Sequence, residues 1–312
     1  KINNQRGYVK SVSKDIVIMN DKIFRDELKF DQFSGIISWY NDTYSFKDVY
    51  IKNNDLQAEI NGDYFHSDKD KRSVDIDMKV ANILIPELKK YYPKQLGEIA
   101  LHWLDTSLLK GIVKNTTIKL NGKLADFPFV DENNIADEGK GLFTVSSSVQ
   151  NSSIEYGAGW PELDAFDFNV EVNNNYIKMT GLKGSLKENH IKNIEVVIDN
   201  FNTEGAIIKV NTILDSPANK IIGAINNSPL KESMKGITTN MIGQGPGELN
   251  VSLEIPVDNA ENIKFSGTYD FQGNSIQNEE VGIPLLENIY GVLGFDNDSI
   301  SIKNSNATLY NS

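Results

Sequence analysis

The chain has 312 residues, no cysteine, and a formal net charge of -12 from 31 basic and 43 acidic side chains. The missing cysteines exclude disulfides and thiolate metal sites, and the negative charge disfavours nucleic acid as a partner. Mean hydropathy is -0.36 and no apolar run approaches the ~20 residues of a spanning helix. Because the chain begins at Lys1 without a signal peptide, we interpret it as a segment of a longer protein.

Apolar and polar residues alternate with a period of two along most of the chain. This pattern predicts antiparallel strands with one apolar and one solvated face. The apolar positions of the clearest runs are Val74, Ile76, Met78 and Val80; Ile118 and Leu120; Val170 and Val172; Leu249, Val251, Leu253 and Ile255; and Ile300 and Ile302. Four dipeptides that lie between apolar positions predict tight turns. These are Asn61-Gly62, Asn121-Gly122, Gly273-Asn274 and Asn297-Asp298.

Two segments break the alternation and predict short helical pairs, near 86–109 and near 217–236. The first is expected to begin at Pro86 and to stop at Gly111. In the second, Ser216 and Ser228 each precede a proline and are expected to cap short helices. The polar stretch 131–140 suggests two parts, 1–135 and 136–312, each with one helical pair. We expect both parts to belong to one continuous sheet.

An internal similarity links two hairpins. Residues 35–47 align without gaps to residues 291–303, with five of thirteen positions identical. One explanation is that any two hairpins look alike. The other is a repeated hairpin unit whose neighbours bury what one unit cannot.

Residues that could carry chemistry are scattered. His66, His102 and His190 lie far apart in the sequence, and the glycines at 243–247 precede a strand pattern where a phosphate loop needs a helix. Paired carboxylates such as Asp75 and Asp77 share the polar face of a strand, where solvation explains them. We therefore expect no catalytic residue, metal site or cofactor, and no enzymatic activity.

One phrase carries a family resemblance. Residues 103–129 read WLDTSLLKGIVKNTTIKLNGKLADFPF, with a helical end, a strand and a closing DFPF. The phrase resembles the AsmA-like proteins of Gram-negative envelopes, in particular the YhdP branch. Residues 33–58 and 228–295 are also similar to that family. The family is associated with phospholipid movement between the inner and outer membranes.

The resemblance implies an elongated, curled antiparallel sheet whose apolar face lines an open, taco-like groove for phospholipid acyl chains. It also implies the periplasm, anchoring to the inner membrane and membrane contact through segments outside this chain, envelope protein partners and a role in outer membrane biogenesis. The groove lining expected here is Ile76, Met78, Ile118, Leu120, Val170, Val172, Leu249, Val251, Leu253, Phe265 and Ile302. If roughly 20 strands stack ~4.8 Å apart, the array is on the order of 100 Å long.

Two other readings stay open from the residues alone. The same alternation fits a structural or assembly factor of the envelope with a filled β core and no lipid. A β-solenoid surface protein or carbohydrate-acting enzyme would need a fixed repeat length, and the irregular strand spacing disfavours it.

Overall fold

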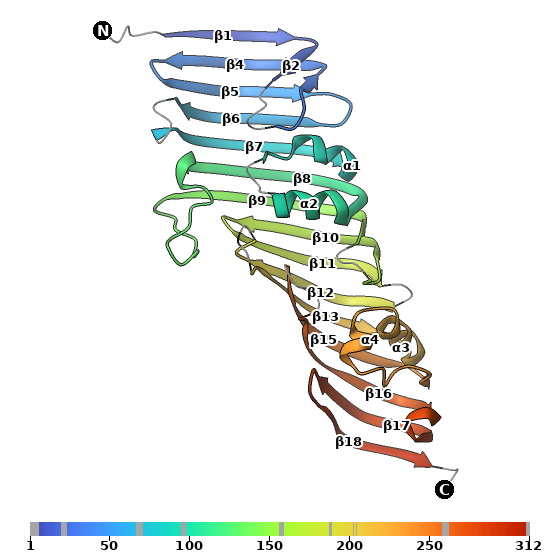
Figure 1. Cartoon of the computed structure of the whole chain (residues 1–312). Helices are drawn as coiled ribbons and strands as arrows, with labels where there is room; N and C mark the ends of the chain where they lie inside the picture. The colour runs from blue at the N-terminus through green and yellow to red at the C-terminus, as the bar shows by residue number, and fades with distance from the viewer. Residues whose placement is uncertain are drawn as a thin grey trace. The chain divides into compact units, whose positions relative to one another are not determined.

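The computed structural model describes residues 6–19, 24–66, 71–94, 98–155, 159–186, 189–201, 203, 205–257 and 262–309. Most of them belong to one 16-stranded sheet (Figure 1). Its strands are β1 (Arg6–Ser13), β4 (Gln32–Tyr40), β5 (Thr43–Lys52), β6 (Gln57–Phe65), β7 (Ser73–Leu84), β8 (Leu108–Lys123), β9 (Gly141–Ile154), β10 (Leu163–Asn173), β11 (Tyr176–Leu186), β12 (Asn189–Asp199), β13 (Ile207–Asp215), β14 (Ile242–Gln244), β15 (Gly247–Pro256), β16 (Lys264–Asn278), β17 (Ile283–Asp296) and β18 (Ile300–Leu309).

The topology of the sheet follows the chain. Each strand lies beside the next long strand in the sequence, from β1 and β4 through to β17 and β18, and β14 pairs with β16. A separate two-stranded sheet joins β2 (Ile16–Ile18) and β3 (Leu28–Phe30). Short connections between sequential strands produce this antiparallel pairing. The predicted fold class, a mainly β protein built on an antiparallel sheet with few short helices, is confirmed.

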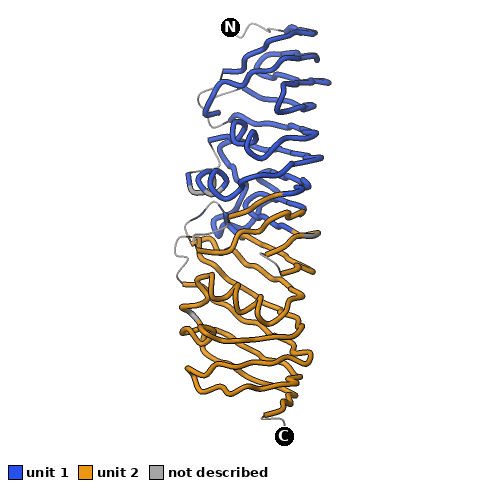
Figure 2. The backbone as a smooth tube through the Cα atoms, turned by 90° about the vertical axis from the view of Figure 1, so that its right-hand side faces the viewer, with its two compact units in different colours: residues 1–151, 169–179, 199–203 blue, residues 152–168, 180–198, 204–312 orange. Residues whose placement is uncertain are grey.

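The structure consists of two compact units (Figure 2). Unit 1 comprises residues 1–151, 169–179 and 199–203, and unit 2 comprises residues 152–168, 180–198 and 204–312. The division near residue 135 stays a prediction. The two units are described separately below.

Helices occur in both segments that break the alternation. The first holds α1 (Ile85–Leu88), η2 (Lys89–Tyr91) and α2 (Glu98–Ser107), and the second holds α3 (Ala218–Asn226) and α4 (Leu230–Ser233). Pro86 occupies the first turn of α1, as predicted. The expected stop at Gly111 was wrong, because Gly111 already belongs to β8. The Ser216 cap was also wrong, since its hydroxyl contacts the Asn189 side chain, whereas the Ser228 hydroxyl accepts the Leu230 N–H at 3.3 Å.

Several predicted turns are positions inside strands. Asn61-Gly62 lies within β6, Asn121-Gly122 within β8, and Gly273-Asn274 within β16. At the first of these, the Asn61 side chain accepts the backbone N–H of Asp48 at 2.8 Å. Asp48 has a left-handed φ of 51°, and the pairing of β5 with β6 shifts by one residue there. The Asn61-Gly62 pair therefore lies opposite a β-bulge in β5, and Asp48 of that bulge has the left-handed backbone angle that many turns also need. The turn at Asn297-Asp298 is confirmed.

The two similar hairpins have the same register. In β4–β5, Trp39 pairs with Tyr44 and Ile37 with Phe46. The aligned residues of β17–β18 pair in the same way, Phe295 with Ile300 and Leu293 with Ile302.

The glycine and bulge positions of the two hairpins also correspond. Asp48 and Asn304 follow the aligned segments and both have a φ of 51°. A Cβ at Gly35 would lie 2.7 Å from the Val49 Cα, and one at Gly291 would lie 2.6 Å from the Ser305 Cα. This agreement in register, bulge and glycine position favours a repeated unit over chance similarity.

The DFPF phrase, residues 126–129, packs against the sheet directly after β8. Phe129 is fully buried, and its ring occupies space that Gly122 and Gly141 leave open, since a Cβ there would come within 2.7 and 2.6 Å of ring atoms. The Asn174 amide donates to the Phe129 carbonyl at 3.1 Å and accepts the Phe143 N–H at 2.8 Å. The phrase thus fixes the long β8–β9 connection by packing and by one buried amide.

We expect Phe129→Ala to lower the free energy of unfolding by about 3–5 kcal/mol, because it removes a buried ring between two glycines that cannot fill the space. Phe65→Ala is the control, since Phe65 is 42% exposed and its truncation should cost clearly less. Urea unfolding of both variants measures the difference. Equal losses would show that Phe129 is not a specific anchor.

Candidate functional site

Four of the predicted lining residues are cross-strand neighbours in unit 1. Ile76 of β7 pairs with Leu120 of β8, and Met78 pairs with Ile118. Paired residues of an antiparallel sheet point to the same face, so these four side chains form one patch.

Adjacent strands extend this patch. Met78 pairs with Ile60 of β6, Ile76 pairs with Gly62, and Gly62 pairs with Phe46 of β5, which pairs with Ile37 of β4. We call this set the apolar stripe; it comprises Ile37, Phe46, Ile60, Ile76, Met78, Ile118 and Leu120. Every member is half-buried, with part of its side chain open to solvent.

The opposite face of the same strands is charged. Asp77 lies between Asn61 and Lys119 across β6–β8, and the Lys119 ammonium lies 3.3 Å from its carboxylate. Both side chains of this ion pair are more than 60% exposed, at 62% and 63%. A pair so exposed contributes little to stability, so its role is solvation of the outer face.

Val170 and Val172 also belong to unit 1. Both are half-buried and alternate with exposed Asn169, Glu171 and Asn173 in β10. They therefore have the intermediate exposure of the apolar stripe.

One end of the strands carrying the stripe is covered. Beyond Phe46 and Ile60, the same face continues with Val49, Ile51 and Ala58, which are only 4%, 7% and 1% exposed. We call the elements at this end the cover; it comprises β2, β3, α1, η2 and α2. Its buried apolar side chains are Leu28, Phe30, Ile85 and Leu101, and Tyr92, which directly follows η2, is buried as well. Helix α1 contacts β7 and β8, and α2 contacts β8 (Figure 1).

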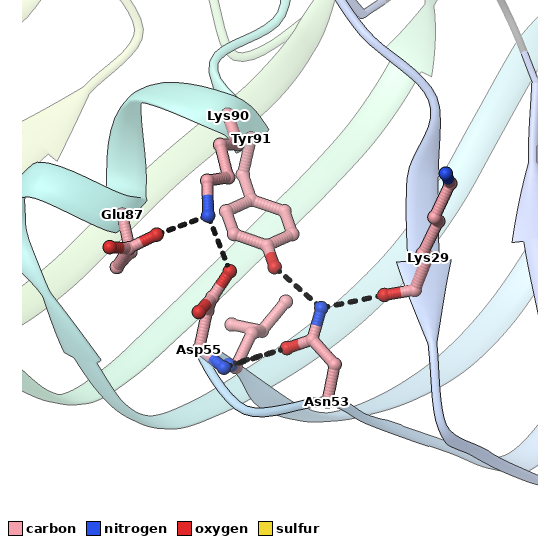
Figure 3. A network of polar contacts seen from close by, with 7 residues as sticks. Lys29, Asn53, Asp55, Glu87, Lys90 and Tyr91 are labelled. Carbon is pink, nitrogen blue, oxygen red and sulfur yellow. Dashed lines mark hydrogen bonds and ion pairs between the residues drawn. The ribbon is translucent and has the colours of Figure 1, made fainter.

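Polar contacts hold the parts of the cover together (Figure 3). The Asn53 amide, between β5 and β6, donates to the Lys29 carbonyl of β3 at 2.7 Å and contacts the Tyr91 hydroxyl of η2 at 2.9 Å. Its oxygen accepts the backbone N–H groups of Asp55 and Leu56 at 3.0 and 2.8 Å. One side chain therefore joins three segments of the chain.

Ion pairs add to this network. The Lys90 ammonium contacts the carboxylate of Asp55 at 2.8 Å and that of Glu87. Asp55 and then Glu87 raise the pKa of Lys90 above its usual value, so the lysine stays charged at neutral pH. Arg25 contacts Asp105 of α2 at 2.6 Å. These contacts are solvent-accessible, so they position the cover more than they stabilise it.

A hollow of about 290 Å³ lies across β6, β7 and β8. Its lining includes the outer-face residues Glu59, Lys79 and Thr117, which pair with one another across the strands. Glu59 and Lys79 bring charged groups to this hollow, and each CH₂ of an acyl chain gains from leaving water only where its new neighbours are apolar. The apolar stripe is therefore the better candidate.

The predicted lining residues of unit 2 have a different environment. Leu249, Val251 and Leu253 share one face of β15, and Phe265 of β16 pairs with Leu253. Their exposed fractions are 8%, 7%, 8% and 4%. Ile302 belongs to the same face through Leu293, Tyr269 and Leu249, but it is 63% exposed on the edge strand β18.

Large aromatic rings accompany these buried residues. Tyr269 and Phe271 lie edge-on at 5.0 Å, and both are buried. The Tyr269 hydroxyl donates to the Ser216 carbonyl at 3.2 Å, and burial raises the pKa of Tyr269 to about 12. Gly243 lies directly under α3, because a Cβ there would be 2.6 Å from the Ile222 side chain. This face of unit 2 is packed against protein, whereas the stripe of unit 1 is half open.

Sequence analysis missed three members of the stripe: Ile37, Phe46 and Ile60. Their signal was present as alternating apolar residues in β4–β6, but the bulge at Asp48 shifts the period within β5. Phe46 and Val49 share a face although an uninterrupted strand would place them on opposite faces. Because of this bulge, the alternation in the sequence did not show that the stripe and the covered end lie on one face of β5.

None of the described helices has the length and apolar character needed to cross a bilayer. Comparison with known proteins gives one family model, described as YhdP protein, which matches residues 1–312. Among curated proteins, the chain is similar to the intermembrane phospholipid transporter YhdP of Escherichia coli (strain K12), with 20% identity over 312 residues. The match covers 98% of this chain and 24% of that relative.

No solved structure matches the chain. The chain spans about a quarter of the length of the relative, 24%, so the match concerns a segment. The family match, in contrast, extends over every residue of the chain. This chain belongs to the YhdP family.

Proposed function

We propose that this chain is a segment of a lipid conduit and that its apolar stripe carries phospholipid acyl chains. The observation that supports the proposal most is the stripe itself, an apolar surface shared by five adjacent strands, β4 to β8, and half open to solvent. A contiguous exposed apolar surface with polar surroundings is typical of a binding site. The relative's name describes movement of phospholipid between membranes.

The energetics of the proposal are simple. Each CH₂ moved from water to the stripe contributes roughly 0.8 kcal/mol, so an acyl chain gains from continuous apolar contact without directed bonds. Movement along the stripe is then passive, since equivalent rows of side chains follow one another across the strands. No catalytic step, metal or cofactor is part of the proposal. In unit 1 the lining proposed is the apolar stripe together with Val170 and Val172. In unit 2 the lining stays a prediction.

We further propose that the segment works in the periplasm of a Gram-negative envelope and contributes to outer membrane biogenesis. Anchoring to the inner membrane, membrane contact and any envelope partners would belong to parts of the protein outside this chain. The basis is the family match together with the 24% coverage of the relative. Immunodetection of the full-length protein in fractionated envelopes tests this placement, and a cytoplasmic pool alone would contradict it.

The alternative function is a structural or assembly factor with a filled core and no cargo. Its support comes from unit 2, where Leu249, Val251, Leu253 and Phe265 are buried among other protein groups. In this reading the stripe of unit 1 would be the exposed margin of a core. Lipid extraction from the purified full-length protein separates the two functions, because a structural factor would hold no stoichiometric phospholipid.

A pair of aspartate substitutions tests the stripe. Leu120→Asp should leave the protein folded, because Leu120 is half exposed, but should reduce bound phospholipid at least severalfold by placing a charge in the acyl path. Leu253→Asp should instead unfold unit 2, because it buries an unpaired charge. Circular dichroism and lipid mass spectrometry are measured on the same samples of the full-length protein.

The control for Leu120→Asp is Thr117→Asp, which adds the same charge on the opposite face of β8, where Thr117 is exposed and pairs with Lys79. It should change neither folding nor bound lipid. If Leu120→Asp unfolds the protein as Leu253→Asp does, the stripe is core and the conduit loses its support.

The cover gives a separate prediction. Asn53→Ala removes the side chain that joins β3, η2 and the β5–β6 connection, so amide hydrogen exchange should rise in 28–30 and 85–91. Asn54→Ala is the control, because Asn54 is the exposed neighbour. The fold of β7 and β8 should be unchanged. Exchange rates equal to those of the control would show that Asn53 does not hold the cover.

A further inference from the structure

The face that carries the apolar stripe changes character along its strands. On β5 the side chains on this face are Ile51 and Val49, then Phe46, and finally Tyr44, which is 38% exposed. On β6 they are Ala58 and Ile60, then Gly62, and finally Tyr64. Both strands therefore run from buried aliphatic groups at the cover to aromatic hydroxyls at the opposite end.

The hydroxyl end is a row of neighbouring rings. Tyr44 pairs with Tyr64 and with Trp39 across the strands, and the Tyr44 and Tyr64 ring centroids are 6.3 Å apart. The Tyr64 hydroxyl lies 3.2 Å from Nδ1 of His66, which is exposed. We call Trp39, Tyr44, Tyr64 and His66 the aromatic row. It adjoins the stripe directly, since Ile37 and Phe46 form the next row of the face.

The distance between the two ends fits the apolar part of a lipid. From Tyr64 to Ile60, the last half-buried residue before the cover, there are four residue steps, which at ~3.3 Å each span about 13 Å. The acyl region of one bilayer leaflet is about 15 Å deep, half of the ~30 Å hydrocarbon core. An acyl chain that begins at the aromatic row therefore ends close to the cover.

We propose that a phospholipid on the stripe lies with its headgroup at the aromatic row and its acyl chains directed toward the cover. This inference rests on the proposed function and adds the orientation of the lipid. Tyr and Trp favour positions where an apolar body meets a wet, polar layer, and their hydroxyl and indole groups donate hydrogen bonds there. The row offers neutral donors and ring faces, which suit a zwitterionic headgroup with phosphate oxygens and an ammonium group.

Unit 2 provides an internal comparison. In the equivalent hairpin, Phe295 and Ile300 occupy the positions of Trp39 and Tyr44. At this pair of positions the hairpin of unit 2 therefore lacks both the Tyr44 hydroxyl and the Trp39 indole N–H. The orientation is proposed for unit 1 alone.

Two photoactivatable phosphatidylethanolamines test the orientation in the full-length protein. One carries a diazirine in the acyl chain beside the ester, and the other carries it beside the terminal methyl group. The ester-proximal probe should label Tyr44 or Tyr64, and the terminal probe should label Ile60 beside the cover, with each labelled residue assigned by peptide fragmentation. The reverse pattern, or the same residues with both probes, would overturn the orientation and leave the conduit standing. Failure of both probes to label this face would remove the conduit as well.

Substitutions then test the hydroxyls. Tyr44→Phe combined with Tyr64→Phe keeps both rings and should lower ester-proximal labelling at the row about fivefold, the factor that corresponds to one hydrogen bond of about 1 kcal/mol. Tyr8→Phe is the control, because Tyr8 is 74% exposed and pairs with Ser38 on the opposite face. If the double variant labels as strongly as this control, the hydroxyls do not hold the headgroup and the proposal fails.

Discussion

The whole arrangement depends on keeping apolar side chains on one face of the sheet from strand to strand. A strand with a period of two loses that face whenever its register slips by one residue. In β5 the bulge at Asp48 absorbs such a slip, so that Val49 pairs with Ile60 as Phe46 pairs with Gly62. The Asn61 side chain takes up the N–H that the bulge leaves unpaired. Stripe and covered end therefore share one surface because of a local irregularity.

Asparagine fixes connections onto the sheet in both units. Asn174, Asn274 and Asn278 are at most 1% exposed, and each donates to a carbonyl of another segment: Phe129, Gln244, and Ile237 with Thr239. A buried carbonyl without a partner is costly, and an amide side chain supplies the missing donor while offering an acceptor of its own. Loops that lie on a sheet can in this way be held without a deep core. The abundance of asparagine in this chain thus has a structural use.

Sequence reasoning succeeded where one rule acted alone. Alternation assigned Ile76, Met78, Ile118 and Leu120 to the apolar faces of strands, and the structure pairs them across β7 and β8. The loss of alternation located both helical segments. It failed where two structures need the same residues. Asn61-Gly62 fits a turn and also a strand position opposite a bulge, where the Asn61 amide accepts the free Asp48 N–H, and only strand pairing separates the two. The sequence could not predict which apolar residues are buried, for a related reason. Leu120 and Leu253 sit in equally regular alternation, yet what covers each comes from distant parts of the chain.

That difference in cover decides what each surface can do. In unit 2 the apolar face includes Tyr269 and Phe271, whose large rings fill space and leave Leu249 and Val251 with 8% and 7% exposure. In unit 1 the stripe is built mostly from aliphatic side chains such as Met78 and Ile118, with Phe46 as an aromatic member, and each keeps part of its side chain open to solvent. Met78 in particular can adapt to an irregular partner. An apolar surface that the protein does not fill favours a ligand able to fill it, and an acyl chain needs no more than that. One pattern of alternating residues therefore yields a packed face in unit 2, where large rings accompany it, and a face half open to solvent in unit 1.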